Sequence, residues 1–256
     1  MLKSFLFEIK DNRRKEGRRY ELGYILLSAI FAISGGADSY RRIHTFIKGN
    51  YKTLYEKFGL KWKRIPAYTA IRNIIMGLSV SDSEGCFREY SLKLSGLSEE
   101  KSDKIFIACG GKTLRGSSDN FKDKKAVQIL SAFLPESGII LAHCEVEEKT
   151  DEIPVAQNLI KELGLENRIF TYDAINCQEK TLKAAAESNN NVTVCVKGNQ
   201  KTLLNDCRDT CDLRLPCSEY EEPVVKERNR IESRRVEVFE EPIITDKKNG
   251  IMSVQL

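Results

Sequence analysis

The sequence predicts an α+β protein with an N-terminal α-helical domain followed by an α/β core. Up to residue 98 the apolar residues recur at helical spacing, whereas from residue 99 short apolar runs typical of strands alternate with helical segments. The segment 95–102 (SGLSEEKS) between them is polar and turn-like. We therefore expect two domains, 1–98 and 99–256, in a chain whose 256 residues suffice for one or two domains.

The N-terminal domain is predicted to contain helices only. Tyr20–Ile33 is strongly apolar and is followed by the stop signal Gly35-Gly36. The other predicted helices are one or two amphipathic helices over Ser39–Phe58, a helix over Pro66–Leu78 with proline in its first turn, and a helix from a Ser81–Glu84 capping box to about Leu94.

The core is predicted to begin with three antiparallel strands and to continue with parallel crossovers. Its expected strands are Lys104–Cys109, Ala126–Leu134, Ile139–Val146, Asn167–Tyr172 and Asn191–Val196. Its expected helices are Asp151–Leu163, Cys177–Ser188 and Gln200–Cys211. The resulting order, β-β-β-α-β-α-β-α, is that of a ribonuclease H-like core.

Composition narrows the classes of protein only modestly. The net charge of +4 permits an anionic partner without requiring one. No apolar run approaches about 18 residues and no signal peptide is recognisable, so we expect a cytoplasmic protein that does not enter a membrane. The eight cysteines include no CxxC pair, and we expect reduced thiols and no zinc site. The two histidines, His44 and His143, have no visible Ser or Cys partner.

Polar residues follow three of the predicted strands. Asp173 comes directly after one strand, and the edge where parallel strands end is where ligands bind in open α/β sheets. Mg²⁺ prefers a few carboxylates together with water and phosphate oxygens, so Asp173 is a candidate metal ligand. The alternative is that Asp173 only caps the helix that follows it.

Several motifs together carry a resemblance to a known family. They are Asp11-Asn12-Arg13-Arg14, Gly35-Gly36-Ala37-Asp38, Arg64-Ile65-Pro66-Ala67-Tyr68, Gly111-Lys112-Thr113-Leu114-Arg115-Gly116-Ser117, Thr150-Asp151-Glu152-Ile153-Pro154, Tyr172-Asp173-Ala174 and Lys197-Gly198-Asn199-Gln200. With them the chain resembles the H-repeat-associated insertion-sequence transposases, a DDE family with a ribonuclease H-like core. The resemblance implies DNA cleavage and strand transfer at transposon ends, Mg²⁺, a homodimer, and Asp173 as the second acid.

Two departures from the family pattern concern the other two acids. The family has an Ile-Asp dipeptide directly before the Gly-Lys-Thr motif, and the residue aligned with its aspartate here is Gly110. Asp103, Asp119 and Asp123 are no obvious substitutes for that aspartate. The third acid lies in a helix beyond anything present here, which leaves Glu232 as a weak candidate. We therefore expect a truncated, degenerate transposase that neither cuts nor joins DNA. The alternatives are a non-catalytic DNA-binding protein that competes with a full-length transposase, or a pseudogene product that does not fold.

DNA contacts are predicted at the polar segments of the core. Lys112 and Arg115 are expected in a glycine-rich loop after the first strand, where cations and backbone amides meet phosphates. The other candidates are Lys197, Asn199, Gln200, Arg230 and Arg234. For the arginines, a solvated surface is equally consistent with the interleaved glutamates. Pro66–Leu78, with Arg64, Arg72 and Asn73, is either a recognition helix or a packing helix.

Overall fold

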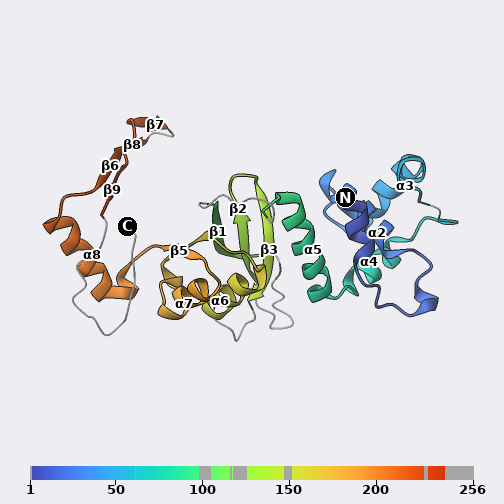
Figure 1. Ribbon diagram of the computed structural model, residues 1–256. Helices are drawn as coiled ribbons and strands as arrows, with labels where there is room; N and C mark the ends of the chain where they lie inside the picture. Colours follow the sequence, from blue (N-terminus) through green and yellow to red (C-terminus); the bar gives the residue numbers. More distant parts are fainter. Residues whose placement is uncertain are drawn as a thin grey trace. The chain divides into compact units, whose positions relative to one another are not determined.

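The computed structural model divides into two compact units. One comprises Met1–Glu100 with Ile139–Ala142, and the other comprises Lys101–Gly138 with His143–Leu256 (Figure 1). The residues that the structure describes are 2–60, 62–97, 105–115, 117, 126–146, 152–227 and 230–239.

The first unit is built from helices: α1 (Leu2–Glu8), α2 (Leu22–Ser34), α3 (Tyr40–Phe58), α4 (Tyr68–Met76) and α5 (Val80–Ser95). The predicted apolar helix is confirmed as α2, which is buried along most of its length because apolar residues occupy all of its faces. The Ser39–Phe58 pattern forms the single helix α3. It begins where the Ser39 hydroxyl accepts a hydrogen bond from the Arg42 amide and ends at Gly59, whose φ of 76° favours glycine.

The starts of two helices differ from the prediction. Pro66 lies before the N-cap residue of α4, Ala67, so it is not in the first turn. The α5 helix begins at Ser79, whose hydroxyl accepts from the Asp82 amide, and not at a Ser81–Glu84 capping box. Asp82 follows Ser79 by three residues, which is the spacing that a capping hydroxyl needs to reach a backbone amide. The cap therefore lies two residues earlier than Ser81, the predicted cap.

Apart from Ile139–Ala142 of β3, which are grouped with the first unit, the second unit contains a five-stranded mixed sheet in the order β3-β2-β1-β4-β5. Its strands are β1 (Ile105–Thr113), β2 (Gln128–Leu134), β3 (Ile139–Val146), β4 (Arg168–Tyr172) and β5 (Asn191–Val194). β1 is antiparallel to β2 and parallel to β4, and β4 is parallel to β5. The helices of this unit are α6 (Glu152–Leu163), α7 (Glu179–Glu187) and α8 (Lys201–Leu213), so the predicted order of core elements is confirmed.

One face of this sheet is buried and carries alternate residues of β1, β2 and β4. Ile107 of β1, Leu130 of β2 and Phe170 of β4 are fully buried. The α6 helix packs against α7 and β2, and its apolar residues are buried as well. The other face carries Phe106 and Phe133, which remain partly exposed. Residues that alternate with the buried set therefore share a more open face of the sheet.

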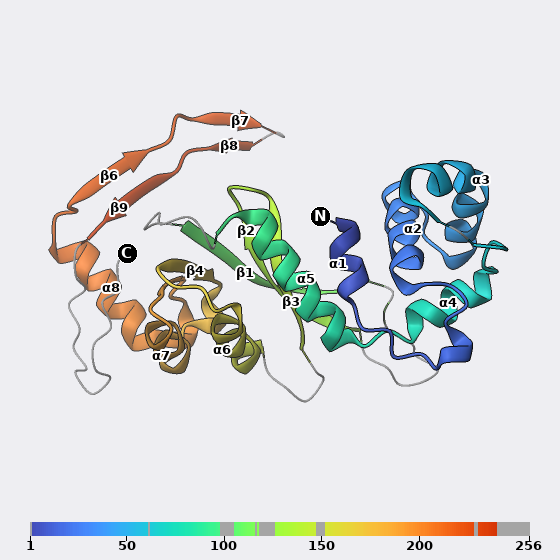
Figure 2. The same cartoon turned by 45° about the vertical axis from the view of Figure 1, so that its right-hand side comes forward.

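After α8 the chain forms a β-ribbon of two consecutive antiparallel pairs (Figure 2). The inner pair is β6 (Ser218–Glu221) with β9 (Arg235–Val238), and the outer pair is β7 (Val225–Glu227) with β8 (Arg230–Glu232). Among the helices that the structure describes, none is both long and apolar enough to cross a membrane.

Candidate functional site

Asp173 lies at the end of β4, on the edge of the sheet where parallel strands end. Its backbone is still extended, and its Oδ1 accepts a hydrogen bond of 2.7 Å from the Ala174 amide at the start of a short 3-10 helix, Ala174–Asn176. The capping role left open by the sequence is therefore present. The carboxylate is nevertheless 73% exposed, so capping leaves most of it accessible to a ligand.

Lys197 pairs with this carboxylate from the segment that follows β5. Its Nζ donates to Asp173 Oδ1 at 2.9 Å, and both side chains are largely exposed. This hydrogen bond lowers the pKa of Asp173 below its ordinary value, and the same bond raises the pKa of Lys197. Asp173 is therefore ionised at neutral pH, which is the state a metal ligand requires, but its charge is already balanced within the protein.

Gly110 lies level with Asp173 on the neighbouring strand. The parallel pairing of β1 with β4 places Ala108 opposite Thr171, and continuing this register by two residues brings Gly110 beside Asp173. Neighbouring strands are about 4.8 Å apart, so side chains at these two positions would meet on the same face. A Cβ added at Gly110 would have no heavy atom within 4 Å, whereas a Cβ at Gly111 would lie 2.8 Å from Glu152 Oε2. The site has room for a carboxylate at 110.

The predicted end of the first strand is wrong, because β1 continues to Thr113 and is not followed by a glycine-rich loop at 110. Gly110 pairs with Ser131 and Lys112 pairs with Ile129 in β2. These ladder hydrogen bonds extend the strand through two glycines whose local propensity for strand is low. Lys112 is consequently an exposed strand residue, and only Arg115 lies in the turn after it.

A serine–histidine pair lies next to Gly110 and was missed in the sequence. Ser131, opposite Gly110, has its Oγ 2.9 Å from Nδ1 of His143 in β3. No nucleophile partner for His143 was visible in the sequence, and the structure shows that Ser131 is its hydrogen-bond partner. The two residues are 12 positions apart, and only the hairpin brings them together.

The side chains at this edge do not form a two-metal centre. Among the described residues, no group of three or more His, Cys, Asp or Glu side chains is placed to hold a metal ion. Glu232 lies in β8, whose strand partner is β7 rather than a strand of the five-stranded sheet, and it pairs with Arg234 at 3.5 Å. Asp103, Asp119 and Asp123 fall outside the described residues. Asp173 is thus the one expected acid found at the sheet edge among the described positions.

The two amides predicted to contact DNA make hydrogen bonds within the protein. Asn199 Nδ2 donates to the Ala174 carbonyl at 2.7 Å, and Gln200 Nε2 donates to the Cys177 carbonyl at 2.8 Å. Both bonds tie the segment after β5 to the segment after β4. They position Lys197 and Asp173 relative to each other, which is a structural task that the sequence alone did not indicate.

The cationic candidates of the β-ribbon also have local partners. Arg234 lies 3.5 Å from Glu232 and 3.9 Å from Glu222. Arg230 belongs to β8, and its side chain is outside the described part of the structure.

All eight cysteines are free thiols, and burial raises the pKa of Cys109 to about 12, so that thiol stays protonated at neutral pH.

The chain is similar to a transposase-associated family model and to proteins that are named as transposases. The family model described as DDE_Tnp_1-associated matches residues 3–91. The chain is 30% identical over 191 residues to "Putative transposase YncI" of Escherichia coli K12, covering 74% of this chain and 75% of that protein. It is 27% identical over 195 residues to "H repeat-associated putative transposase YhhI" of the same strain, covering 76% of this chain and 50% of that protein.

Other relatives are longer or more distant. "Putative transposase YncI" of Escherichia coli O157:H7 is 30% identical over 202 residues, which cover 79% of this chain and 50% of the relative. The chain thus spans about half the length of several curated relatives that it matches. A piggyBac transposase synaptic complex with hairpin DNA aligns with 13% identity and a TM-score of 0.36 over 86% of this chain and 53% of that one, a level that does not define a shared fold.

Proposed function

This chain belongs to the transposase family of YncI and the H repeat-associated proteins, and from that premise we propose that it is a DDE-type insertion-sequence transposase that has lost the ability to cleave DNA. The observation that carries the proposal is the parallel pairing of β1 with β4 up to Ala108 and Thr171, whose register, continued by two residues, brings Gly110 level with Asp173 at one edge of the sheet. A carboxylate at 110 and Asp173 would form the pair of neighbouring ligands on which such chemistry depends.

The topology of the sheet supports a ribonuclease H-like core within the proposed domain 99–256. Three strands come first along the chain and lie at one side of the sheet in the order β3-β2-β1, and the two parallel strands β4 and β5 follow at the other side. The remaining domain, 1–98, corresponds to the segment matched by the DDE_Tnp_1-associated model. We propose these two domains as the functional units of the chain.

The proposed loss of cleavage rests on the donor set at the sheet edge. In the intact family a divalent cation, Mg²⁺ by our proposal, would supply activation of the attacking hydroxyl and stabilisation of the leaving oxygen. Among the residues that the structure describes, Asp173 is the one member of the expected acid set at this edge, since Gly110 has no side chain and Glu232 pairs with Arg234 on the ribbon. Two-metal cleavage depends on several carboxylates that hold both ions on the phosphodiester, so no cleavage step is assigned to this chain.

DNA at transposon ends is the proposed partner, and a homodimer is the proposed assembly on two such ends. A second candidate function, a DNA-binding competitor of a full-length transposase, is favoured by the Lys197–Asp173 ion pair. Lys197 balances the negative charge of Asp173, so this carboxylate has a counter-charge without a metal ion. Such a protein would occupy DNA ends without processing them.

The test combines binding and cleavage on one DNA. A supercoiled plasmid carrying the element's terminal inverted repeats is incubated with the full chain and Mg²⁺ or Mn²⁺, and binding to a duplex of the same repeat is measured in parallel. We expect binding without nicking. Nicking by the wild-type chain that Asp173→Asn abolishes would contradict the proposed inactivity, and failure to bind any DNA would contradict the transposase assignment of this chain.

A further inference from the structure

The positive charge of this chain is concentrated in its N-terminal part. Residues 1–100 contain 18 Lys and Arg against 11 Asp and Glu, a net charge of +7. Residues 101–256 contain 23 Lys and Arg against 26 Asp and Glu, a net charge of −3. The modest total of +4 therefore hides two units of opposite sign. A polyanion is attracted to the first and repelled by the second.

Six of those 18 cations lie in ten consecutive residues, 10–19 (KDNRRKEGRR), which we call the arginine loop. It connects α1, which ends at Glu8, to α2, which begins at Leu22, and it contains one short 3-10 turn, Lys15–Gly17. Six like charges in a connection of this length repel one another, so a defined conformation needs internal support.

Two of the arginines and Asp11 supply that support. Asp11 accepts hydrogen bonds from Arg13 through the backbone amide (3.1 Å), Nε (2.8 Å) and Nη2 (2.6 Å), and these two side chains are only 19% and 17% exposed. Arg13 also donates to the Gly17 and Tyr20 carbonyls. Arg18 donates to the carbonyls of Arg13 and Asp11. The loop is thus closed by hydrogen bonds to its own backbone.

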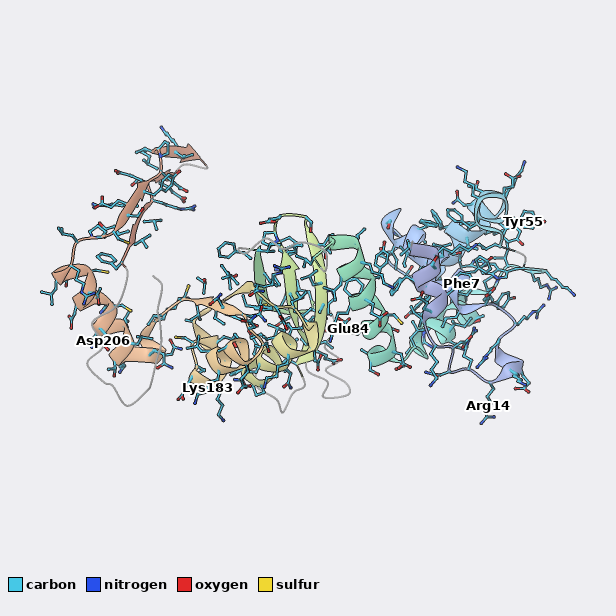
Figure 3. The ribbon with its side chains drawn as sticks, viewed as in Figure 1. Phe7, Arg14, Tyr55, Glu84, Lys183 and Asp206 are labelled. Carbon is cyan, nitrogen blue, oxygen red and sulfur yellow. The ribbon has the colours of Figure 1, made fainter. Side chains whose placement is uncertain are left out.

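The other cations of the loop face solvent. Arg14, Lys15 and Arg19 are exposed, and among the described residues none of them has a carboxylate within 4.0 Å. Arg14 points away from the helices of its unit (Figure 3). The rigid part of the loop therefore presents three cations whose charge is not balanced by a neighbouring acid.

A cavity of about 390 Å³ lies beside these cations. The loop contributes Arg13, Gly17 and Arg19 to its wall, and α4 contributes Asn73. Arg72, the neighbour of Asn73 on α4, is exposed. Tyr20, Ala70 and Ile74 make the rest of the wall mostly apolar, and the Arg13 guanidinium is already bonded to Asp11, Gly17 and Tyr20. Arg19 and Asn73 are therefore the groups of this wall that can donate to an anion, and a guanidinium group matches the geometry of phosphate.

We propose that the arginine loop, with Arg72 and Asn73 of α4 beside it, is the principal DNA-backbone contact of this protein, in which Arg14, Lys15 and Arg19 bind phosphates. The proposal rests on the transposase function proposed above, which makes DNA the polyanion concerned. The clamp of Asp11 and Arg13 holds the loop in one conformation before DNA arrives, and this reduces the entropy lost on binding.

The polar side chains of the second unit are less available to bind phosphate than those of the arginine loop. Lys197 is paired with Asp173, Arg234 lies near two glutamates, and the amides of Asn199 and Gln200 are bonded to backbone carbonyls. These groups would have to exchange existing partners for phosphate, whereas Arg14, Lys15 and Arg19 have no acid to exchange among the described residues, and Arg19 only lies over the Tyr20 ring. Lys112 and Arg115 of the core are exposed as well, but they belong to the part of the chain whose net charge is −3. We therefore place the main DNA contact in the first unit.

The test measures how DNA affinity depends on salt. The full chain is titrated into a fluorescein-labelled mixed-sequence duplex at KCl concentrations from about 50 to about 200 mM, and log Kobs is plotted against log[KCl]. Each lost phosphate contact reduces the slope by about 0.9, so the triple variant Arg14→Gln, Lys15→Gln, Arg19→Gln should lose nearly 3 units of slope and at least about tenfold in affinity near 100 mM.

A matched control separates a specific surface from general charge. The control is the triple variant Lys48→Gln, Lys52→Gln, Lys57→Gln on α3, which removes the same charge from exposed positions of the same unit. It should change the slope by less than about 0.9, the value expected for one phosphate contact. Arg14→Lys with Arg19→Lys keeps the charge and should keep the slope. Circular dichroism checks that each variant is folded.

The outcomes distinguish this inference from the proposed function. Equal losses in the loop triple and the α3 triple, or a loss in the α3 triple alone, would overturn the arginine loop as the main contact while DNA binding itself stands. A loop triple with an unchanged slope would do the same. A wild-type chain that does not bind the duplex at all would overturn both this inference and the proposed function.

Discussion

Gly110 and Gly111 are adjacent glycines in β1, yet replacing each with aspartate should lower the free energy of unfolding by different amounts. At position 110 the new Cβ enters open space, with no heavy atom within 4 Å. The new carboxylate would lie beside Asp173, and two charges about 4 Å apart in water repel by about 1 kcal/mol. Lys197 offsets part of this repulsion, so Gly110→Asp should lower the free energy of unfolding by about 1 kcal/mol or less.

At position 111 the same substitution meets a neighbour. The Cβ would lie 2.8 Å from Oε2 and 3.2 Å from Cδ of Glu152, the first residue of α6, whose Oε1 also accepts a hydrogen bond from Asn176. The atoms met are the far end of a flexible side chain, so Glu152 can move away at the cost of its hydrogen bond from Asn176 and of the repulsion between two carboxylates. Gly111→Asp should therefore lower the free energy of unfolding by about 1–2 kcal/mol, more than Gly110→Asp does.

Urea denaturation followed by far-UV circular dichroism measures both values, and Mn²⁺ adds a second readout. If 110 and 173 form a carboxylate pair, Mn²⁺ at tenfold above its Kd should stabilise Gly110→Asp by about 1.4 kcal/mol, and Asp173→Asn in that background should abolish the gain. The wild type and Gly111→Asp should gain much less. A Gly111→Asp variant as stable as Gly110→Asp, or equal stabilisation of the wild type by Mn²⁺, would refute the register argument.

Three further predictions concern the supports of each unit. Asn199→Ala removes a part-buried hydrogen bond to the Ala174 carbonyl and should cost about 0.5–1.5 kcal/mol in urea denaturation, with an unchanged salt slope for DNA binding. The hydrogen bond from Arg13 lowers the pKa of Asp11. The stability that this pair contributes is therefore present above the unfolded-state pKa of about 4 and is lost as pH falls through the folded-state pKa. Thermal melts should show that the melting temperature of Asp11→Asn falls less on acidification than that of the wild type. Phe170→Ala empties a fully buried position and should cost about 3–5 kcal/mol in urea, and a smaller loss would mean that the sheet face repacks.

The sequence was sufficient where the signal was local. The apolar run before Asp173 and the polar residues after it predicted β4 and the position of the carboxylate, because a short buried strand and its end are both visible within a few residues. The helix cap at Ser79 was missed because three serines lie close together and only the backbone geometry selects one of them.

The sequence failed where partners come from distant segments. β1 extends through Gly110 and Gly111 because β2 supplies hydrogen bonds to residues of low strand propensity. Ser131 and His143 meet only across the hairpin, and the amides of Asn199 and Gln200 find their carbonyl partners more than 20 residues away. None of these contacts has a periodic signature, so no pattern within one segment could have indicated them.

The two properties attributed to this chain depend on different kinds of contact, and this makes them separable. The conformation of the arginine loop rests on hydrogen bonds between residues at most seven positions apart, all within the first unit. The carboxylate pair instead requires two strands about 60 residues apart, and glycine at position 110 leaves no packing gap, since a Cβ there would have no heavy atom within 4 Å. One substitution can therefore remove cleavage while it leaves the fold and the DNA-contact surface intact. On the function proposed above, a chain altered in this way would compete for DNA, and its effect on a full-length relative should scale with its affinity for the DNA ends and not with any residual catalysis.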